Sequence, residues 1–183
     1  KPVSMMADLA GYLGWRSPLR STAMAVMSEG VSTQAQTNTL SVATAAETLA
    51  RHPSAVQDLW FARLYLLKPI VILCLSLFWL LSGLVPLANL EGAASHFLTL
   101  LPPSAATALT LATCVLDIGL GLAVVIKRFS KGAMQGMLVV TALYLLGATV
   151  LEPSLWLDPL GPLVKVLPSI VLTLAALATL KER

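Results

Sequence analysis

The stretch RHPSAVQDLWFARLYLLKPIVILCLSLFWLLSGLVPL, residues 51–87, decides the fold. From Ile70 to Leu90 no residue is charged, so no face of a helix in this run carries the charges that a water-facing helix would show. A helix needs about 20 apolar residues to cross the roughly 30 Å hydrocarbon layer of a membrane, and residues 69–90 meet that length. The stretch therefore predicts a membrane-spanning helix.

The composition of the whole chain agrees with this prediction. Hydrophobic residues make up 57% of the 183 residues and charged residues 11%, against about 45–50% and about 25% in ordinary globular domains. Such a chain cannot cover its apolar surface with polar groups, so we expect a lipid bilayer to solvate much of it. The net charge of +3 is too small and too scattered for a nucleic-acid-binding surface, so nucleic acid is not an expected partner.

Three further apolar runs predict membrane spans at about 104–126, 132–151 and 160–180. Asp117 interrupts the first of them and Lys165 lies near the start of the last. Regular alternation of polar and apolar residues is absent, so the sequence predicts an all-α polytopic four-helix bundle and no barrel. Ser104, after two prolines, is a candidate N-cap for the second span, and Gly132 is expected to begin the third.

The basic residues predict the direction of the spans, because cytoplasmic loops carry an excess of lysine and arginine. Two of the loops between spans contain acidic residues and histidine but no lysine or arginine outside the spans. The basic residues flank the opposite ends of the spans: Arg51, Arg63 and Lys68; Lys127, Arg128 and Lys131; Lys181 and Arg183. Both termini are therefore predicted to be cytoplasmic.

Residues 53–67, just before the first span, combine apolar residues at helical spacing with aromatic and basic ones. Trp60, Phe61 and Tyr65 are types favoured at the lipid headgroups, and with Arg63 and Lys68 they are candidate interface anchors. An amphipathic helix at the cytoplasmic membrane surface is the preferred interpretation. The alternative is that 53–67 simply extends the first spanning helix.

Residues 1–52 have the composition of a cytoplasmic connecting segment with short helices, and 53–183 that of a membrane domain. One helix is expected to end near Gly14, and a second to begin after Ser17 as N-cap and end at Gly30. A polar linker follows, and Thr44 with Glu47 has the spacing of a capping box. The chain begins with Lys1 rather than methionine, so we expect it to start inside a longer reading frame or after processing.

Asp117 is the most informative single residue. A carboxylate at the middle of a span costs about 2.5–3.5 kcal/mol on insertion scales, so Asp117 is expected to face the bundle interior. It is either a proton-relay or ligand-binding group, or a structural group hydrogen-bonded to Tyr144 or Thr141 of the third span. Gly119 and Gly121 follow it, and small residues allow helices to approach closely.

Lys165 and Glu152 are the other candidate functional residues inside or beside the membrane. At similar depth they are expected to form an outer-face ion pair, while a pair between Lys165 and Asp117 requires the lysine to reach inward. Snorkelling of Lys165 to the headgroups is the alternative. The segment LEPSLWLDPLGP, residues 151–162, is read as a loop anchored by Trp156, with a pocket as the less favoured interpretation.

The sequence provides no pattern for a metal site or a thiol-exchange centre. Cys74 and Cys114 lie at different depths and form no C-x-x-C motif, and His52 and His96 fall on opposite sides of the membrane. We therefore expect no metal and no disulfide.

Four stretches resemble the DoxX-like membrane domains: SAVQDLWFARLYLLKP at 54–69, LDIGLGLAV at 116–124, DPLGPLVKVLP at 158–168, and LGWRSPLRSTA at 13–23. The last resembles the connecting region of bacterial proteins in which such a domain follows an NAD(P)-binding domain of the short-chain dehydrogenase type. The resemblance implies a location in the bacterial inner membrane and a link to membrane oxidoreductases, some of them quinone-linked. This chain departs from that pattern because it contains no G-x-G-x-x-G motif and no βαβ pattern, so any NAD(P) would bind a domain upstream or on a separate chain.

The leading functional hypothesis is a membrane domain that anchors an NAD(P)-binding domain and offers a quinone- or lipid-accessible pocket near Asp117. It is not expected to be catalytic alone. The alternatives are a small oligomeric proton-coupled transporter and a passive membrane scaffold. The sequence leaves open whether the chain forms a homo-oligomer.

Overall fold

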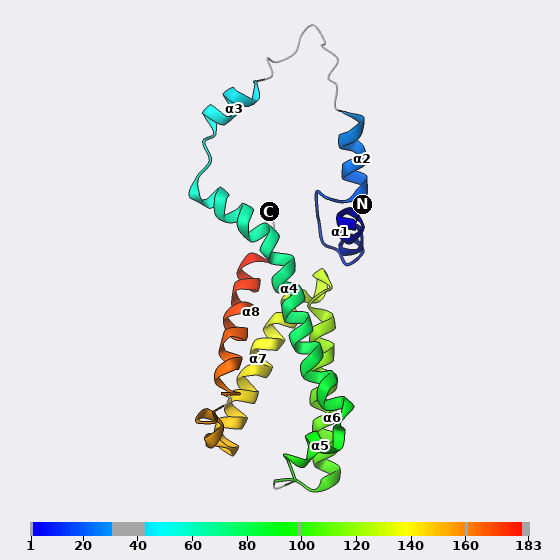
Figure 1. Ribbon diagram of the computed structural model, residues 1–183, viewed down its shortest axis with the longest axis vertical. Coiled ribbons are helices and arrows are strands. Elements are labelled where there is room, and N and C mark those ends of the chain that lie inside the picture. Colours follow the sequence, from blue (N-terminus) through cyan, green and yellow to red (C-terminus); the bar gives the residue numbers. More distant parts are fainter. Residues whose placement is uncertain (1, 31–42, 99, 160, 181–183) are drawn as a thin grey trace. The chain divides into compact units, whose positions relative to one another are not determined.

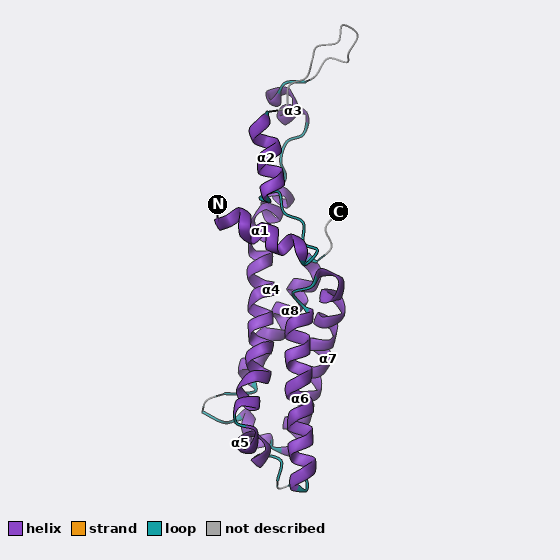
Figure 2. Ribbon diagram, turned by 90° about the vertical axis from the view of Figure 1, so that its right-hand side faces the viewer, coloured by secondary structure: helices purple, strands orange, loops and turns teal. Residues whose placement is uncertain are grey.

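The computed structural model describes residues 2–30, 43–98, 100–159 and 161–180, and all regular secondary structure in these ranges is helical (Figures 1 and 2). The chain divides into two compact units, Lys1–Leu66 and Leu67–Arg183, so the dividing point lies within one long helix, α4. The elements in order are α1 (Pro2–Tyr12), α2 (Ser21–Glu29), α3 (Ala45–Arg51), α4 (Val56–Ala88), α5 (Leu90–Ser95), α6 (Pro103–Ala123), α7 (Lys127–Leu151), the 3-10 helices η1 (Pro153–Trp156) and η2 (Val164–Val166), and α8 (Leu167–Thr179).

In the first unit, α1 and α2 form a helical hairpin whose connection begins with a glycine-dependent helix end. Gly14 adopts φ +90°, which glycine reaches without steric cost, and the N–H of Trp15 donates to the carbonyl of Ala10 at 3.0 Å. This 6→1 bond, with Gly14 N–H donating to the Gly11 carbonyl, is a Schellman motif. The predicted helix end near Gly14 is confirmed.

The start of α2 differs from the prediction. The helix begins at Ser21 with Arg20 in the N-cap position, and the Ser17 hydroxyl instead accepts from the N–H of Leu19 within the preceding turn. The first backbone N–H of α2 donates to Asp8 of α1 at 3.1 Å, so a side chain from the neighbouring helix replaces the local cap. Hydrogen bonding from Ser21, helped by the nearby Arg20 guanidinium, lowers the pKa of the Asp8 carboxyl below its ordinary value of 3.8.

The other two caps predicted in this part of the chain are confirmed. Gly30 ends α2 with φ +72°, and Thr44 and Glu47 form both hydrogen bonds of the capping box at the start of α3. Of the predicted polar linker, 31–42 lie outside the described residues.

The second unit is built from four helices that alternate in direction along the bundle, α4, α6, α7 and α8 (Figure 1). α6 packs on α7 and α7 on α8, and α4 lies against α6. Three of these helices are long and apolar enough to cross a membrane: Val56–Ala88, Pro103–Ala123 and Lys127–Leu151. The predicted all-α membrane bundle is confirmed.

The predicted fourth span is shorter than expected. The sequence predicts a span over 160–180, whereas the apolar helical segment covers Val164–Thr179. At 1.5 Å per residue it is about 24 Å long, less than the roughly 30 Å of the hydrocarbon layer. Pro159, Gly161 and Pro162 explain the late start, because proline lacks a donor and Gly161 takes φ +57°.

Two helix starts also differ from the sequence prediction. α6 begins at Pro103 with Pro102 as N-cap, so Ser104 is not the cap. α7 begins at Lys127 rather than Gly132, so the predicted basic loop forms the first turns of the helix. Lysine and arginine are good helix formers, and a helix that extends beyond the apolar region can carry them into the headgroups.

Residues 56–66 belong to the same helix as the first span, because α4 is assigned without a break from Val56 to Ala88. The assignment supports the alternative interpretation, in which this segment extends the first span. Pro69 and Pro86 both lie inside α4 and are tolerated there, although each removes one backbone donor.

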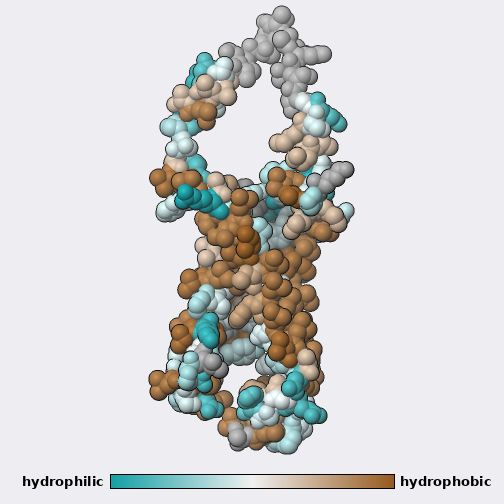
Figure 3. Space-filling view, in the orientation of Figure 1, coloured by the Kyte–Doolittle hydropathy of each residue, from teal (hydrophilic) through white to brown (hydrophobic). Residues whose placement is uncertain are grey.

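The surface of the helix bundle is mainly apolar, as a lipid-facing surface requires. Figure 3 shows large hydrophobic areas along it, with hydrophilic residues gathered at its lower end. The large apolar side chains exposed on α4, α6, α7 and α8 include Leu73, Leu77, Leu81, Val115, Val139, Leu143, Leu146, Val171 and Leu174. Such an area would be an aggregation hazard in water, so its partner is the hydrocarbon of a bilayer.

Most charged residues of this bundle lie near its two ends. Lys68, Lys127, Arg128 and Lys131 lie near the end where α4 enters the unit and α7 begins, whereas the other end has Glu91, Glu152 and Asp158 together with one basic residue, Lys165. The Lys68 ammonium donates to the carbonyl of Leu180 at 3.4 Å, just beyond the end of α8. A cation there satisfies a terminal carbonyl and interacts favourably with the helix dipole.

Candidate functional site

The centre of the candidate site is a carboxylate that α6 buries between two other helices. Asp117 is 4% exposed. Ser82 of α4 donates its hydroxyl to Oδ2 at 2.9 Å, and Tyr144 of α7 donates to Oδ1 at 3.0 Å. We call Asp117, Ser82 and Tyr144 the carboxylate triad; each of the two carboxylate oxygens accepts one hydroxyl.

The triad forms because α4 and α6 approach more closely than most helices can. A Cβ at Gly83 of α4 would lie 2.6 Å from the Cys114 carbonyl of α6, and a Cβ at Gly121 of α6 would lie 2.9 Å from the Leu80 N–H nitrogen of α4. Ser76 adds an interhelical hydrogen bond to the Gly121 carbonyl at 2.7 Å. Each of the two helices thus has a glycine that faces the other helix. The close approach that these glycines allow places the Ser82 hydroxyl within reach of the carboxylate.

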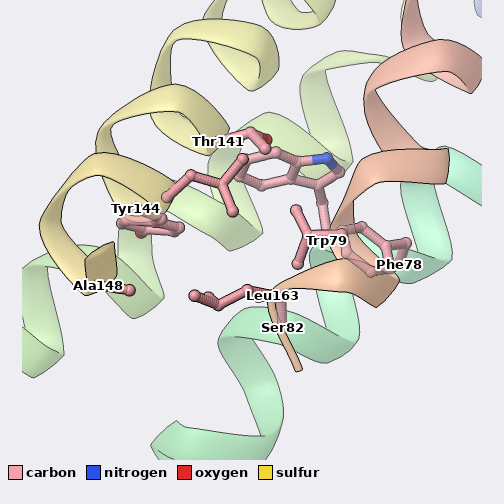
Figure 4. A pocket seen from close by; sticks show the side chains of 9 residues that line it. Phe78, Trp79, Ser82, Thr141, Tyr144, Ala148 and Leu163 are labelled. Carbon is pink, nitrogen blue, oxygen red and sulfur yellow. The ribbon is translucent and has the colours of Figure 1, made fainter. Parts of the chain in front are cut away.

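A cavity of about 190 Å³ adjoins the triad (Figure 4). Ser82 and Tyr144 lie in its wall, whereas Asp117 does not line it. The wall is otherwise apolar and partly aromatic. Its residues are Phe78, Trp79, Ser82, Thr141, Tyr144, Leu145, Ala148, Leu163 and Val166.

The helical spacing of the lining residues explains why they meet. On α7, Tyr144, Leu145 and Ala148 follow Thr141 by three, four and seven positions, so all four residues lie on one face of the helix. On α4, Phe78 and Ser82 are four positions apart. The third wall comes from Leu163 and Val166, so the irregular segment before α8 supplies residues to the site.

The structure brings together part of the predicted site. Asp117 and Tyr144 are hydrogen-bonded, as one of the two sequence interpretations expected. Thr141 lies on the cavity wall but does not bond to Asp117. Ser82 was missed, because one serine within a long apolar run gives no periodic signal. Of the predicted close-approach glycines, Gly121 is in tight contact and Gly119 faces open space.

Lys165 and Glu152 lie away from the triad. Glu152 follows the end of α7, is exposed and accepts from the Ser154 hydroxyl at 3.3 Å. Lys165 is exposed on η2. Among the described residues no ion pair joins Lys165 to Glu152 or to Asp117, so neither predicted pair forms.

The candidate interface anchors fall on α4 and η1. Trp60, Phe61 and Arg63 are exposed, and the Tyr65 ring lies 6.0 Å from that of Phe61. Trp156 donates its indole N–H to Thr149 at 3.0 Å, which holds η1 on the end of α7. No described residue of 151–162 lines the cavity, consistent with the loop interpretation of this segment.

The two hydrogen bonds of the triad do not offset the free energy needed to bury the Asp117 carboxylate. Asp117 lies about 6 Å from the midpoint of α6 at 1.5 Å per residue, where a carboxylate costs up to about 2.5–3.5 kcal/mol on insertion scales. Interhelical side-chain hydrogen bonds in membrane proteins average about 0.6 kcal/mol each, so two of them offset only part of that cost. An apolar residue at position 117 would have a lower free energy of membrane insertion. The carboxylate is therefore expected to have a function in addition to holding the helices together.

Comparison with known families fits this architecture. The model of the DoxX-like family matches residues 76–174, more than half of the chain. The chain belongs to the DoxX-like family. The matched region of this DoxX-like chain contains the complete carboxylate triad and every residue of the cavity wall. No curated protein and no solved structure matches the chain.

Proposed function

We propose that this chain is the integral membrane domain of a bacterial oxidoreductase system in the inner membrane, with both termini on the cytoplasmic side. It anchors an NAD(P)-binding domain, on the same or a separate chain, and receives a quinone or lipid in the cavity beside the carboxylate triad. The observation that carries the binding part is a buried carboxylate whose two hydroxyl donors both form the wall of an otherwise apolar cavity.

The cavity has the composition of a binding site for an amphiphile. Ligand sites are concave and mostly apolar, with a few placed polar groups, and the hydroxyls of Ser82, Thr141 and Tyr144 supply them here. All regular secondary structure in the described part of the chain is helical, so this proposal assigns NAD(P) to a partner domain.

The direct test is photo-crosslinking with a quinone that carries a photoreactive group on its ring. The proposal expects labelled peptides from α4 and α7 that contain the lining residues. Ala148→Phe, which fills the cavity, should abolish labelling, whereas Ala142→Phe on the exposed side of the same helix should not. Equal labelling of the two variants would remove the pocket from the proposal.

The redox part needs a separate measurement. Membranes that contain the native protein should oxidise NAD(P)H with added quinone faster than membranes with Ala148→Phe, and Ala142→Phe should match the native rate. A quinone-independent rate would leave only the anchoring role.

The triad also supports the scaffold alternative, because it joins three helices. A passive scaffold predicts that Asp117→Asn changes stability and no other property. A proton-coupled transporter predicts instead a proton-dependent flux in liposomes that Asp117→Asn abolishes.

A further inference from the structure

The hydrogen bonds of the triad determine which polar groups the cavity offers. Ser82 and Tyr144 both donate to Asp117, and a hydroxyl has only one proton to donate. Their oxygens keep lone pairs, and both residues line the cavity. Toward a ligand they therefore act as acceptors, and they favour a ligand that donates.

Thr141 differs from four other threonines in the helices of the second unit. Thr107, Thr110, Thr149 and Thr173 each donate to the carbonyl four residues earlier. Thr141 is 6% exposed and lines the cavity, and its hydroxyl has no hydrogen-bond partner in the described part of the chain. This hydroxyl is therefore available to an occupant of the otherwise apolar cavity, and an occupant that bonds to it is favoured.

The two observations together specify the polar group of the occupant. A hydroxyl both donates and accepts, so it can donate to a triad oxygen and accept from Thr141. An ether or a carbonyl can only accept. Figure 4 shows Thr141 and Tyr144 one turn apart on the same helix, on the side that faces Trp79.

The size and composition of the wall specify the body of the occupant. An apolar cavity of about 150 Å³ accommodates benzene, and this cavity measures about 190 Å³, which is room for one six-membered ring with small substituents. Phe78, Trp79 and Tyr144 provide aromatic surfaces, which favour edge or offset contact with another ring.

We propose that the cavity binds a phenol-type head group: one six-membered ring whose hydroxyl donates to the Ser82 or Tyr144 oxygen and accepts from Thr141. This inference rests on the proposed function, because it concerns the same cavity. It specifies the ligand as a single ring with a hydroxyl group.

The test compares 4-methylphenol with 4-methylanisole, which differ only in the methyl group that removes the hydroxyl proton. Trp79 is the reporter, and Phe replaces the other three tryptophans, Trp15, Trp60 and Trp156. Fluorescence titration of the chain in detergent should give about 10-fold tighter binding of the phenol, the effect of one lost buried hydrogen bond. Thr141→Val should weaken the binding of both compounds by about 2- to 10-fold and leave the ratio near 10, because the ether oxygen can also accept from Thr141. Thr107→Val, which lies outside the cavity, should leave both affinities unchanged. The two compounds partition differently into micelles, so the parent ratio is corrected by the measured partition of each compound; this partition is the same for every variant and cancels between variants.

The outcomes separate this inference from the proposed function. Equal binding of the phenol and the ether in the parent protein refutes the hydroxyl assignment and leaves a ring-binding cavity. Binding of both compounds that Thr141→Val leaves unchanged refutes the part assigned to Thr141. If neither ring binds, both the inference and the quinone part of the proposed function are wrong. The thermal shift of the unmodified chain with the same two compounds repeats the test without the tryptophan replacements.

Discussion

The contact between α4 and α6 gives a quantitative prediction for Gly83→Ala. The new Cβ would lie 2.6 Å from the Cys114 carbonyl oxygen, about 0.8 Å short of the 3.4 Å at which ordinary contact begins. The obstructing atom belongs to the backbone of α6, so no side-chain rotation relieves it and the helices must separate. Overpacking of this kind costs about 1–3 kcal/mol.

Two smaller terms adjust that figure. Separation of the helices weakens the hydrogen bond from Ser76 to the Gly121 carbonyl, worth about 0.6 kcal/mol in a membrane protein. Replacing glycine by alanine in a helix regains up to about 1 kcal/mol of propensity. We therefore expect Gly83→Ala to lower the free energy of unfolding by about 1–2 kcal/mol.

The assay is unfolding in mixed micelles with an increasing fraction of dodecyl sulfate, monitored by circular dichroism. Gly121→Ala should shift the transition in the same direction, because its Cβ would meet Leu80 at 2.9 Å. Gly119→Ala is the matched control: it lies on α6, two residues away, and its Cβ would meet nothing within 4 Å. If Gly83→Ala and Gly119→Ala agree within about 0.5 kcal/mol, the usual range for surface substitutions, the close approach is not real.

Three further predictions concern the ends of the helices. The ionised Asp8 carboxylate, whose pKa is lowered in the folded protein, stabilises the start of α2. This stabilisation is fully present above the ordinary pKa of 3.8 and is lost as the pH falls through the lowered pKa of the folded protein. Amide hydrogen exchange in α2 should become faster over that pH range, and Asp8→Asn should remove the pH dependence. Lys68→Met should expose the Leu180 carbonyl and speed local exchange at the end of α8, while Lys131→Met should not. Cysteine introduced at Lys131 should react with an impermeant maleimide only from the cytoplasmic side, and cysteine at Ser95 only from outside; the reverse pattern would contradict the predicted topology.

Much of the membrane architecture follows from composition. Long apolar runs have one stable solvent, so the spans predicted at 69–90, 104–126 and 132–151 from length and hydropathy are largely helical, although α4 ends at Ala88 and α6 at Ala123. The ends of these helices were less predictable. The extension of α7 to Lys127 depends on how far a helix continues into the headgroup region, which apolar content does not specify.

The candidate site shows a similar division. The burial of Asp117 follows from the cost of a carboxylate in lipid, and Tyr144 follows from depth along the neighbouring span. Ser82 and the start of α2 depend on contacts between helices: a glycine pair in one case, and a carboxylate from another helix in the other. Local sequence gives no account of a partner that lies dozens of residues away or on another element.

The bond between Lys68 and Leu180 has a consequence for connectivity. It joins residues 112 positions apart, at the beginning and end of the second unit. A bridging peptide of about four residues, at roughly 3.3–3.6 Å per residue, would connect these two points. The bundle is thus suited to circular permutation, with new termini at the short turn between α6 and α7. The order of the helices along the chain would change, whereas each helix would keep the same packing neighbours.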